Sequence, residues 1–534
     1  MKKAFLKNGE PYIWLSGGAL GFCLLMVVGM MLLILVNAMG VFWPDQLVQF
    51  GMRDGTVILG QVKDRESGEA GKPGDRIKVR RANRDIDTAD FIWLEEGDIE
   101  QRQEPPDALV LERREWGDFF GEIKAVKNAG QIVAEAPAEG LATVVERLPE
   151  TRKVQEQITS IEKKEVDDIN RAHERLRLRT AGLERQSITS GPEIDRLDEE
   201  KSELQRRYDL QTARIDTLKQ QLQDLVVLGA ADGTEKEIPL ASIVRYYQPN
   251  RMGAFSKMRM YLSKMWEFVS DDPRESNTEG GTFPAIFGTV MMVLLMTVIV
   301  TPLGVICAVY LREYAHQGWL VSAVRIAVNN LAGVPSIVFG VFGVAFLIYF
   351  VGGRIDALFF SDYLPAPTLG TGGILWASLT LALLTLPVVI VATEEGLAAV
   401  AREIREASLA LGATKFETTT RVVLPAVMPS ILTGLILAMA RAAGEVAPLM
   451  VTGVVKLAPA LPIDDHWPYL HLDRKFMHLG FHIYDAGFQS PNVDAARPIV
   501  YATTLLLVTI VIVLNLTAIL LRNHLRKRHA STGF

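Results

Sequence analysis

The stretch "REASLALGATKFETTTRVVLP", Arg405 to Pro425, is polar and charged, yet it separates two strongly apolar runs of the sequence. It is too short for a separate domain, and its pattern is too regular for an unstructured loop. Good helix formers fill 397–411, Gly412 permits a sharp reversal of the backbone, and a second short helix can follow. Pro425 is expected to stop or turn the backbone before the next apolar run.

The rest of the chain is divided sharply by polarity. The 534 residues are 49% hydrophobic and 22% charged, and most of the charge lies in 44–280. An apolar helix of about 20 residues crosses the ~30 Å of hydrocarbon in a bilayer. Six apolar runs are long enough to do so: 13–36, 284–311, 323–350, 372–393, 428–453 and 498–521. The sequence therefore predicts a mainly α, polytopic membrane protein with a large polar insertion.

The first apolar run could also be read as a signal peptide, because lysines precede it. These are Lys2, Lys3 and Lys7. The apolar core is longer than that of a signal peptide, and no small-residue cleavage site stands before Trp43 and Pro44. We therefore expect a retained membrane anchor.

Basic residues near the ends of the spans predict their orientation, because lysine and arginine gather in cytoplasmic loops. Lysines precede the first span, and "RNHLRKRH", 522–529, follows the last one. Both termini are therefore expected in the cytoplasm, together with 394–427. The same topology makes 44–280 an external insertion between 1–43, which holds the first span, and the membrane domain 281–534.

The insertion has the pattern of an α+β unit. Short alternating runs such as "TVILGQVKD" and "DFIWLEE" are typical of strands, and "DG", "SG" and "PP" separate them. A heptad pattern predicts the second arm of an antiparallel coiled-coil hairpin over 151–225: Ile194, Leu197, Leu204, Tyr208, Ile215, Leu218, Leu222 and Leu225. The turn is "SITSGPE", 187–193. Because "DGT" recurs at Asp54 and Asp232, we expect one small β unit that the hairpin interrupts.

No catalytic or metal-binding pattern is present in the sequence. The chain lacks the "GxxxxGK[ST]" phosphate loop, so it is not expected to bind ATP by the common route. Its two cysteines, Cys23 and Cys307, lie in predicted spans, which leaves the insertion without a disulfide. His173 has no neighbouring ligands, and acids balance the basic cluster 80–84, which argues against nucleic-acid binding. Energy for any pumping must come from a partner or an ion gradient.

The segment around Gly412 fits the pattern E-A-x4-G-x9-V-x-L-P without a gap. It resembles the EAA loop of ABC-importer permeases, in which the short helix after the glycine seats in a groove of the ATP-binding subunit. The resemblance implies contact with an ATPase through Glu406, Ala407, Gly412, Lys415, Phe416, Glu417, Val422, Leu424 and Pro425. An amphipathic helix lying on lipid is the alternative, and the acids on its polar face disfavour it.

Further motifs are similar to those of phosphate-importer permeases. They are "LAGVPSIVFGVFG", 331–343, and "ARAAGEVAPLM", 440–450, of which the second favours the PstA type. The resemblance covers about 280–534 and implies a type I importer fold with six transmembrane helices in a bacterial inner membrane. It also implies a PstC-type permease, a PstB-type ATPase dimer that binds the ATP and magnesium, and a periplasmic PstS-type phosphate-binding protein. It does not account for 44–280.

Two charged residues lie in the predicted fifth span. Arg441 and Glu445 are four positions apart and so are expected on one helix face. Each would cost ~2.5–3.5 kcal/mol in hydrocarbon, so both should face protein or water. They either line a path for phosphate or form an ion pair that only fixes helix packing. Weaker candidates for the pathway come from the predicted third span: Asn329, Asn330, Pro335 and Ser336.

Two alternatives to a phosphate permease stay open at this point. The chain could be a permease for another oxyanion or solute, or a membrane-anchored sensor or scaffold that signals through its coiled coil. A sensor has no need of an EAA-like loop, which favours a non-enzymatic permease subunit that forms half of a translocation pathway.

Overall fold

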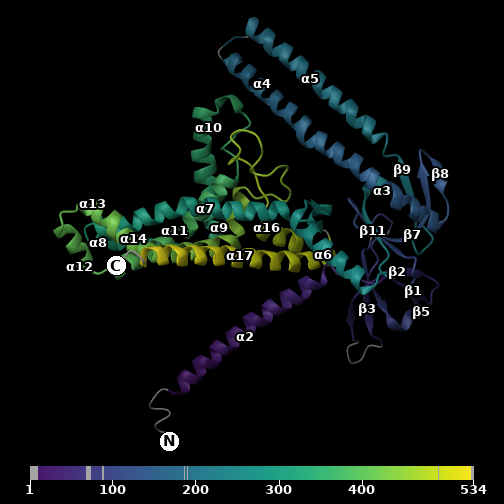
Figure 1. Cartoon of the computed structure of the whole chain (residues 1–534), viewed down its shortest axis with the longest axis horizontal. Coiled ribbons are helices and arrows are strands. Elements are labelled where there is room, and N and C mark those ends of the chain that lie inside the picture. Colours follow the sequence, from purple (N-terminus) through teal and green to yellow (C-terminus); the bar gives the residue numbers. More distant parts are fainter. Residues whose placement is uncertain are drawn as a thin grey trace. The chain divides into compact units, whose positions relative to one another are not determined.

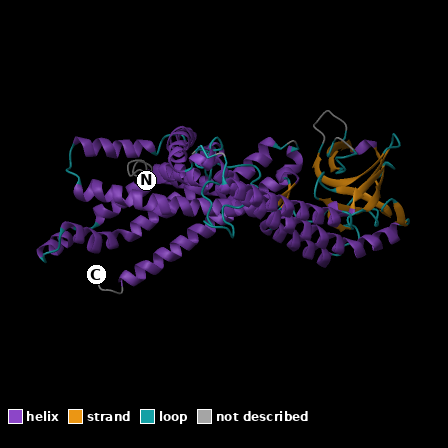
Figure 2. Ribbon diagram, turned by 90° about the horizontal axis from the view of Figure 1, so that it is seen from above, coloured by secondary structure: helices purple, strands orange, loops and turns teal. Residues whose placement is uncertain are grey.

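The computed structural model describes residues 10–67, 74–86, 89–185, 187–188, 190–490 and 492–530. The N-terminal lysines on which the predicted orientation rests lie outside these residues. The chain divides into two compact units. The helical unit comprises Met1–Val41, Phe268–Asp272 and Gly281–Phe534, and the insertion unit comprises Phe42–Glu267 and Pro273–Gly280. Figure 2 shows the strands of the insertion unit and the helices that make up most of the chain.

Four long helices form the centre of the helical unit. They are α7 (Phe283–Val309), α11 (Ile374–Ala399), α14 (Leu424–Gly444) and α17 (Val493–Ala530), and Figure 1 shows them alongside one another. Their facing sides are apolar and buried, as at Met292, Leu381 and Ala442. The unit also contains α2 (Glu10–Gly40) and the short helix α16 (Leu479–Tyr484).

Six helices of the described residues are long and apolar enough to cross a membrane. They are Tyr12–Gly40, Phe283–Tyr314, Ser336–Phe359, Ile374–Ala399, Lys415–Gly444 and Val493–His524. The expected number of spans and the positions of the first, second, fourth and sixth agree with the sequence to within a few residues. The third and fifth are displaced.

The third candidate span begins later than predicted. The apolar run 323–350 is broken between α8 (Trp319–Leu331) and α9 (Ser336–Phe342). The predicted position was wrong because Pro335, with ψ of 134°, has no N–H to continue α8 and stands instead at the N-cap of α9. From α9 the helix continues through a π-helix (Gly343–Gly352) into α10 (Gly353–Phe359).

Among the described residues, the insertion unit contains two larger antiparallel sheets with the same five-strand topology. Their strand orders are β4-β3-β2-β1-β5 and β10-β9-β7-β6-β11, with β8 added beside β7. In each sheet a 3-10 turn, Glu96–Asp98 or Leu240–Ser242, precedes the fifth strand, which pairs with the first. The strands are β1 (Val48–Met52), β2 (Val57–Glu66), β3 (Arg76–Arg80), β4 (Phe91–Glu95), β5 (Ile99–Gln103), β6 (Leu109–Arg113), β7 (Phe119–Asn128), β8 (Gln131–Ala134), β9 (Asp224–Gly229), β10 (Glu235–Pro239) and β11 (Ile243–Tyr247). The strands before and after the hairpin therefore belong to one compact unit but form two sheets, and the hairpin interrupts only the second of them.

The repeated tripeptide "DGT" makes the same turn in both sheets. The Asp54 and Asp232 carboxylates each accept a hydrogen bond of 2.9 Å from the backbone N–H two residues later. Gly55 and Gly233, with φ of 85° and 87°, supply the left-handed backbone that glycine adopts without steric cost. The turns join β1 to β2 and β9 to β10, so the repeat reflects shared turn chemistry in two sheets.

A long helical hairpin is inserted between β8 and β9. Its first arm runs through α3 (Pro137–Ser160), a π-helix (Ile161–Val166) and α4 (Asp167–Arg185), and α5 (Pro192–Lys219) is its second arm. The first arm therefore begins earlier than the predicted residue 151. The second arm ends at Lys219, earlier than the predicted residue 225, because Leu225 already lies in β9. Apolar residues of both arms meet in two clusters, around Ile158, Ile161 and Ile215 and around Leu176, Leu197 and Leu204. Coiled-coil geometry for this hairpin stays a prediction.

The chain leaves the insertion unit through α6 (Ala254–Ser270). A short ribbon of β12 (Pro273–Arg274) and β13 (Glu279–Gly280) follows, and then α7 begins. The boundary between the two units falls inside α6, because Phe268–Asp272 belongs to the helical unit, whereas the ribbon Pro273–Gly280 belongs to the insertion unit.

Candidate functional site

The candidate coupling segment, Arg402–Pro425, lies at one end of the helical unit, where Figure 1 also places the C-terminal end of α17. α11 ends at Ala399, and Val400 and Ala401 are extended, with ψ of 126° and 146°. These two residues break the helix, so that α12 (Arg402–Ala410) is a separate short helix beyond the span.

A tight turn built on Gly412 ends α12. The N–H of Gly412 donates to the carbonyl of Leu409 at 3.0 Å, and the N–H of Ala413 donates to that of Ser408 at 3.3 Å. These two bonds form a Schellman motif, which needs a left-handed residue after the helix. Gly412 provides it with φ of 89°, as the sequence predicted.

The second helix of the segment begins at a capping box. The side chain of Thr414 accepts from the N–H of Glu417 at 3.2 Å, and the Glu417 carboxylate accepts from the N–H of Thr414 at 3.0 Å. Both bonds satisfy backbone donors that a helix start leaves free. The reversal at Gly412 is thus followed at once by a well-defined helix start.

Pro425 does not stop the backbone, contrary to the prediction. α13 (Lys415–Glu417) runs through a π-helix (Thr418–Val423) directly into α14, which has Pro425 in its first turn. The wider π-turn accommodates a residue that lacks an N–H and would clash with the preceding turn of a regular helix. The second helix of the segment is therefore the beginning of the fifth candidate span, Lys415–Gly444.

Contacts of Arg405, Ser408 and Lys415 hold the coupling segment in place. The Arg405 guanidinium donates to the Glu313 carboxylate at 2.9 Å and to the Leu397 carbonyl at 2.7 Å. The hydroxyls of Ser408 and Thr418 lie 2.9 Å apart and join α12 to the helix after the turn. The Lys415 ammonium lies 5.1 Å from the ring centroid of Tyr314.

Large apolar side chains are exposed on both sides of the turn. Leu411 is 90% exposed and Phe416 is 67% exposed, and Leu409 and Ile404 are exposed too. Among the predicted contact residues, Glu406, Ala407, Gly412, Lys415 and Phe416 are exposed, and Glu417, Val422, Leu424 and Pro425 are half-buried. Exposed apolar groups next to charges are characteristic of a surface that another protein covers.

The Arg441–Glu445 pair lies at a break in the fifth apolar run. Arg441 Nε lies 3.5 Å from Glu445 Oε1, so the two side chains form an ion pair. They do not share a helix face, because α14 ends at Gly444 and Glu445 is its extended C-cap. A new short helix, α15 (Ala447–Thr452), starts after Val446. Non-helical backbone at membrane depth is tolerated where it faces protein or a water-filled space.

The other predicted pathway residues lie earlier in the chain, on α8 and at the start of α9. Asn329 and Asn330 are exposed in the last turn of α8, outside the third candidate span. Pro335 is the exposed N-cap of α9, and Ser336 is half-buried at its first position. Further along α9, a Cβ on Gly340 would lie 2.7 Å from Pro448 Cα, so this glycine allows α9 and α15 to pack closely.

The sequence did not indicate two residues that support the coupling segment. Glu313 and Tyr314 end the π-helical extension of α7 (Tyr310–Tyr314), and the partner of Glu313 is 92 positions away. The one local signal is an acidic residue directly after an apolar run. A single sequence does not show which basic residue Glu313 pairs with.

Comparisons with known proteins agree with this geometry. Residues 300–530 match the family described as "Binding-protein-dependent transport system inner membrane component". The chain is 30% identical over 258 residues to "Probable ABC transporter permease protein YqgI" of Bacillus subtilis (strain 168), which covers 47% of this chain and 81% of that protein. It is 36% identical over 192 residues to "Phosphate transport system permease protein PstA" of Yersinia pestis, covering 35% of this chain. It spans only 57% of the length of that relative.

Among solved structures, a chain of the MetNI methionine ABC transporter in an inward-facing conformation aligns with a TM-score of 0.34 and 19% identity. The alignment covers 49% of this chain and 98% of that one. The matched family region, 300–530, includes the coupling segment, the Arg441–Glu445 pair and four of the six candidate spans. This multi-pass membrane protein therefore belongs to the family of binding-protein-dependent transport system inner membrane components, the permeases of ABC importers.

Proposed function

We propose that this chain is a transmembrane permease subunit of an ATP-driven importer of inorganic phosphate. It forms half of the translocation pathway, and a PstC-type permease forms the other half. A PstB-type ATPase dimer supplies the energy and binds the ATP and magnesium. A periplasmic PstS-type protein delivers phosphate.

The exposed turn at 411–416 is the observation that supports coupling to an ATPase. Leu411 and Phe416 present apolar surface on a turn that is fixed by the Schellman motif and the capping box. Such preorganisation lowers the entropic cost of binding a partner groove. Because the helix that starts at Lys415 continues into the fifth span, movement of a bound ATPase would act on α14 directly.

A membrane topology with both termini in the cytoplasm of a bacterial inner membrane fits the proposal. The coupling segment then faces the cytoplasmic ATPase, and 44–280 lies in the periplasm. Arg474 would lie on the outer side against the usual charge bias, but Asp464 neutralises it through an ion pair of 2.6 Å.

Phosphate is proposed as the substrate because of the likeness to PstA-type proteins and the position of Arg441. An arginine in the last turn of a membrane helix, next to a break in the helix, can offset the charge of an anion. Its partner Glu445 would hold the side chain when no anion is present. As phosphate passes through the pathway, its oxygens replace the Glu445 carboxylate as the partner of Arg441.

Binding of the ATPase tests the coupling role most simply. The full-length chain would be purified in detergent with the second permease, and its affinity for the ATPase subunit measured. We expect Phe416→Ala and Leu411→Ala each to weaken binding about tenfold or more, since buried aromatic and aliphatic anchors contribute ~2 kcal/mol.

The matched control is Phe359→Ala, which removes a similarly exposed phenyl ring, 77% accessible, from the end of α10. This variant should bind the ATPase as the unmodified chain does. Equal binding by all three variants would refute the assignment of the coupling surface.

A further inference from the structure

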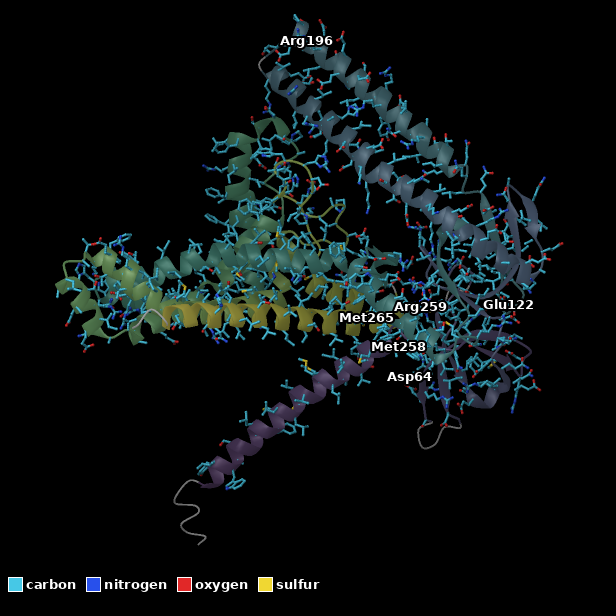
Figure 3. All side chains as sticks on the ribbon, in the orientation of Figure 1. Asp64, Glu122, Arg196, Met258, Arg259 and Met265 are labelled. Carbon is cyan, nitrogen blue, oxygen red and sulfur yellow. The ribbon has the colours of Figure 1, made fainter. Side chains whose placement is uncertain are left out.

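The helix α6 presents three different faces. One face is buried or half-buried at Lys257, Met260, Tyr261, Lys264, Glu267 and Phe268. A second face is polar and exposed at Ser256, Arg259 and Ser263. The third is an exposed stripe of large apolar residues with spacings of three and four: Phe255, Met258, Leu262, Met265, Trp266 and Val269. Figure 3 labels Met258, Arg259 and Met265 on this helix.

The apolar stripe is too continuous to be scattered surface hydrophobicity. Phe255 is 86% exposed and Trp266 is 73% exposed, and the stripe follows the helix over four turns at a spacing of 3.6 residues per turn. Isolated exposed apolar residues are common on proteins, but an unbroken row of six needs a cover. What covers the stripe follows from the positions of the middle and of the C-terminal end of α6.

The middle of α6 contacts two aromatic residues that come shortly after the first span in the sequence. The ring of Tyr261 lies 6.4 Å from that of Phe42 and 6.1 Å from that of Trp43. These two residues follow directly after α2, which ends at Gly40 and is exposed and apolar along most of its length. Tyrosine and tryptophan gather at the boundary between hydrocarbon and water, where an aromatic group of this kind belongs.

The C-terminal end of α6 is joined to the start of the second span. The N–H of Thr282 donates to the carbonyl of Phe268 at 2.8 Å, and the Thr282 hydroxyl donates to the same oxygen at 3.0 Å. The N–H of Phe283, the first residue of α7, donates to the carbonyl of Asp271 at 3.2 Å. The last turn of α6 is therefore fixed at the level where α7 enters the membrane.

The charges of α6 suit a lipid surface with anionic headgroups. Glu267, the one acid of the helix, is paired with Arg245 and Arg274, each at 2.6 Å. Lys257 and Arg259 take part in none of the ion pairs found among the described residues. Basic residues beside an apolar stripe that contains tryptophan and phenylalanine are the pattern of helices that lie in the membrane interface.

We propose that α6 lies in the bilayer surface on the side of the insertion, with the stripe from Phe255 to Val269 in the lipid of that leaflet. Arg259 then contacts the phosphate groups of anionic phospholipids. The helix then holds the chain at the bilayer surface just before the second span begins. The proposal requires that both helices span the membrane, and it is independent of the transported solute.

Spin labels on the full-length chain test this arrangement. Cys23 and Cys307 are first replaced by serine, and single cysteines are then introduced by Met258→Cys, Leu262→Cys and Met265→Cys on the stripe. Ser256→Cys and Ser263→Cys on the exposed polar face are the matched controls. The chain is reconstituted alone into vesicles of phosphatidylethanolamine and phosphatidylglycerol. Collision rates of each label with oxygen, which concentrates in lipid, and with a water-soluble nickel complex are compared.

The oxygen-to-nickel ratio is expected to be several-fold higher at the three stripe positions than at the two serine positions. Equal ratios at all five would show that the stripe faces water and would overturn the proposal. Spin–spin broadening at Leu262→Cys, lost on dilution with unlabelled chain, would show that a second copy covers the stripe. Protection from nickel that appears only after the second permease is added would assign the stripe to that protein. Either of these results would also overturn it.

Discussion

The Arg405 guanidinium donates a hydrogen bond of 2.9 Å to the carboxylate of Glu313, which lies 92 positions earlier at the end of the α7 extension. The same side chain donates to the carbonyls of Leu397 and Val400, each at 2.7 Å, at the end of α11. One arginine therefore connects α12 to the ends of two candidate spans. We infer that α12 moves together with these helices.

Loss of this connection should uncouple transport from ATP hydrolysis. We expect Arg405→Ala to lower ATP-driven uptake about tenfold or more, because hydrogen bonds to charged groups contribute ~1.5–3 kcal/mol each. ATPase binding should change less, since the exposed residues of the turn remain. Uptake and binding are measured on the same reconstituted preparation. Arg402→Ala, which removes an exposed arginine from the first turn of α12, is the control. Equal uptake by the two variants would contradict the role of Arg405.

Gly412 should be needed for its backbone conformation. A Cβ at this position would meet nothing within 4 Å, so crowding does not exclude other residues. A residue with a Cβ at φ of 89° costs roughly 1–2 kcal/mol, and asparagine tolerates the region better than alanine. We expect Gly412→Ala to weaken ATPase binding about tenfold and Gly412→Asn to weaken it less. The reverse order of affinities would argue against a conformational requirement.

The coupling turn could be predicted because its determinants are local. Gly412, the Thr414–Glu417 pair and the run of helix formers before them lie within about twenty residues, and each has a known backbone preference. The predicted positions of the third and fifth spans were displaced because a continuous apolar run of sequence does not reveal where a helix is interrupted. Pro335 starts a helix where a span was expected to continue, and Glu445 ends one.

Long-range pairing could not be predicted from one sequence. Nothing in "VQFGM", 48–52, indicates that β1 pairs with both β2 and β5, or that a second sheet repeats the order. The Arg405–Glu313 contact is of the same kind. By contrast, Arg441 and Glu445 are four residues apart and their pairing followed from proximity, although the helix geometry assumed for it was wrong.

Two alternative roles are open for the pair Arg441 and Glu445, and variants of the two residues distinguish them. If Arg441 offsets the charge of phosphate, Arg441→Ala should abolish uptake, and the double variant Arg441→Ala with Glu445→Ala should remain inactive. If the pair only fixes packing, the double variant should recover transport, because no unpaired charge is left. Phosphate uptake by proteoliposomes is measured for the single variant and for the double variant. ATPase binding is the control for assembly and should be unchanged in every variant.

Glu279 should make the stability of the insertion unit depend on pH. Burial raises the pKa of this carboxyl from 4.5 to about 8, and Arg80, 3.8 Å away, offsets only part of the effect. Between these values the folded chain holds a proton that the unfolded chain releases. The contribution of Glu279 to the free energy of unfolding should therefore be largest below about pH 4.5 and fall, by on the order of a few kcal/mol, as the pH rises through about 8.

Limited proteolysis of the full-length chain in detergent checks this dependence. Cleavage within the insertion should become faster as the pH rises across that window. In Glu279→Gln, which keeps the shape of the side chain and removes its titration, cleavage should stay slow throughout. The same rise in cleavage for the variant would show that another group is responsible.

Radiolabelled phosphate uptake tests the central claim most directly. The chain, a PstC-type permease and the ATPase dimer are reconstituted in vesicles with ATP on the ATPase side and phosphate-loaded binding protein on the other. The account predicts ATP-dependent accumulation of phosphate that unlabelled phosphate competes away, that sulfate does not, and that Gly412→Glu abolishes. Accumulation that sulfate competes away equally, or undiminished uptake by Gly412→Glu, would contradict it.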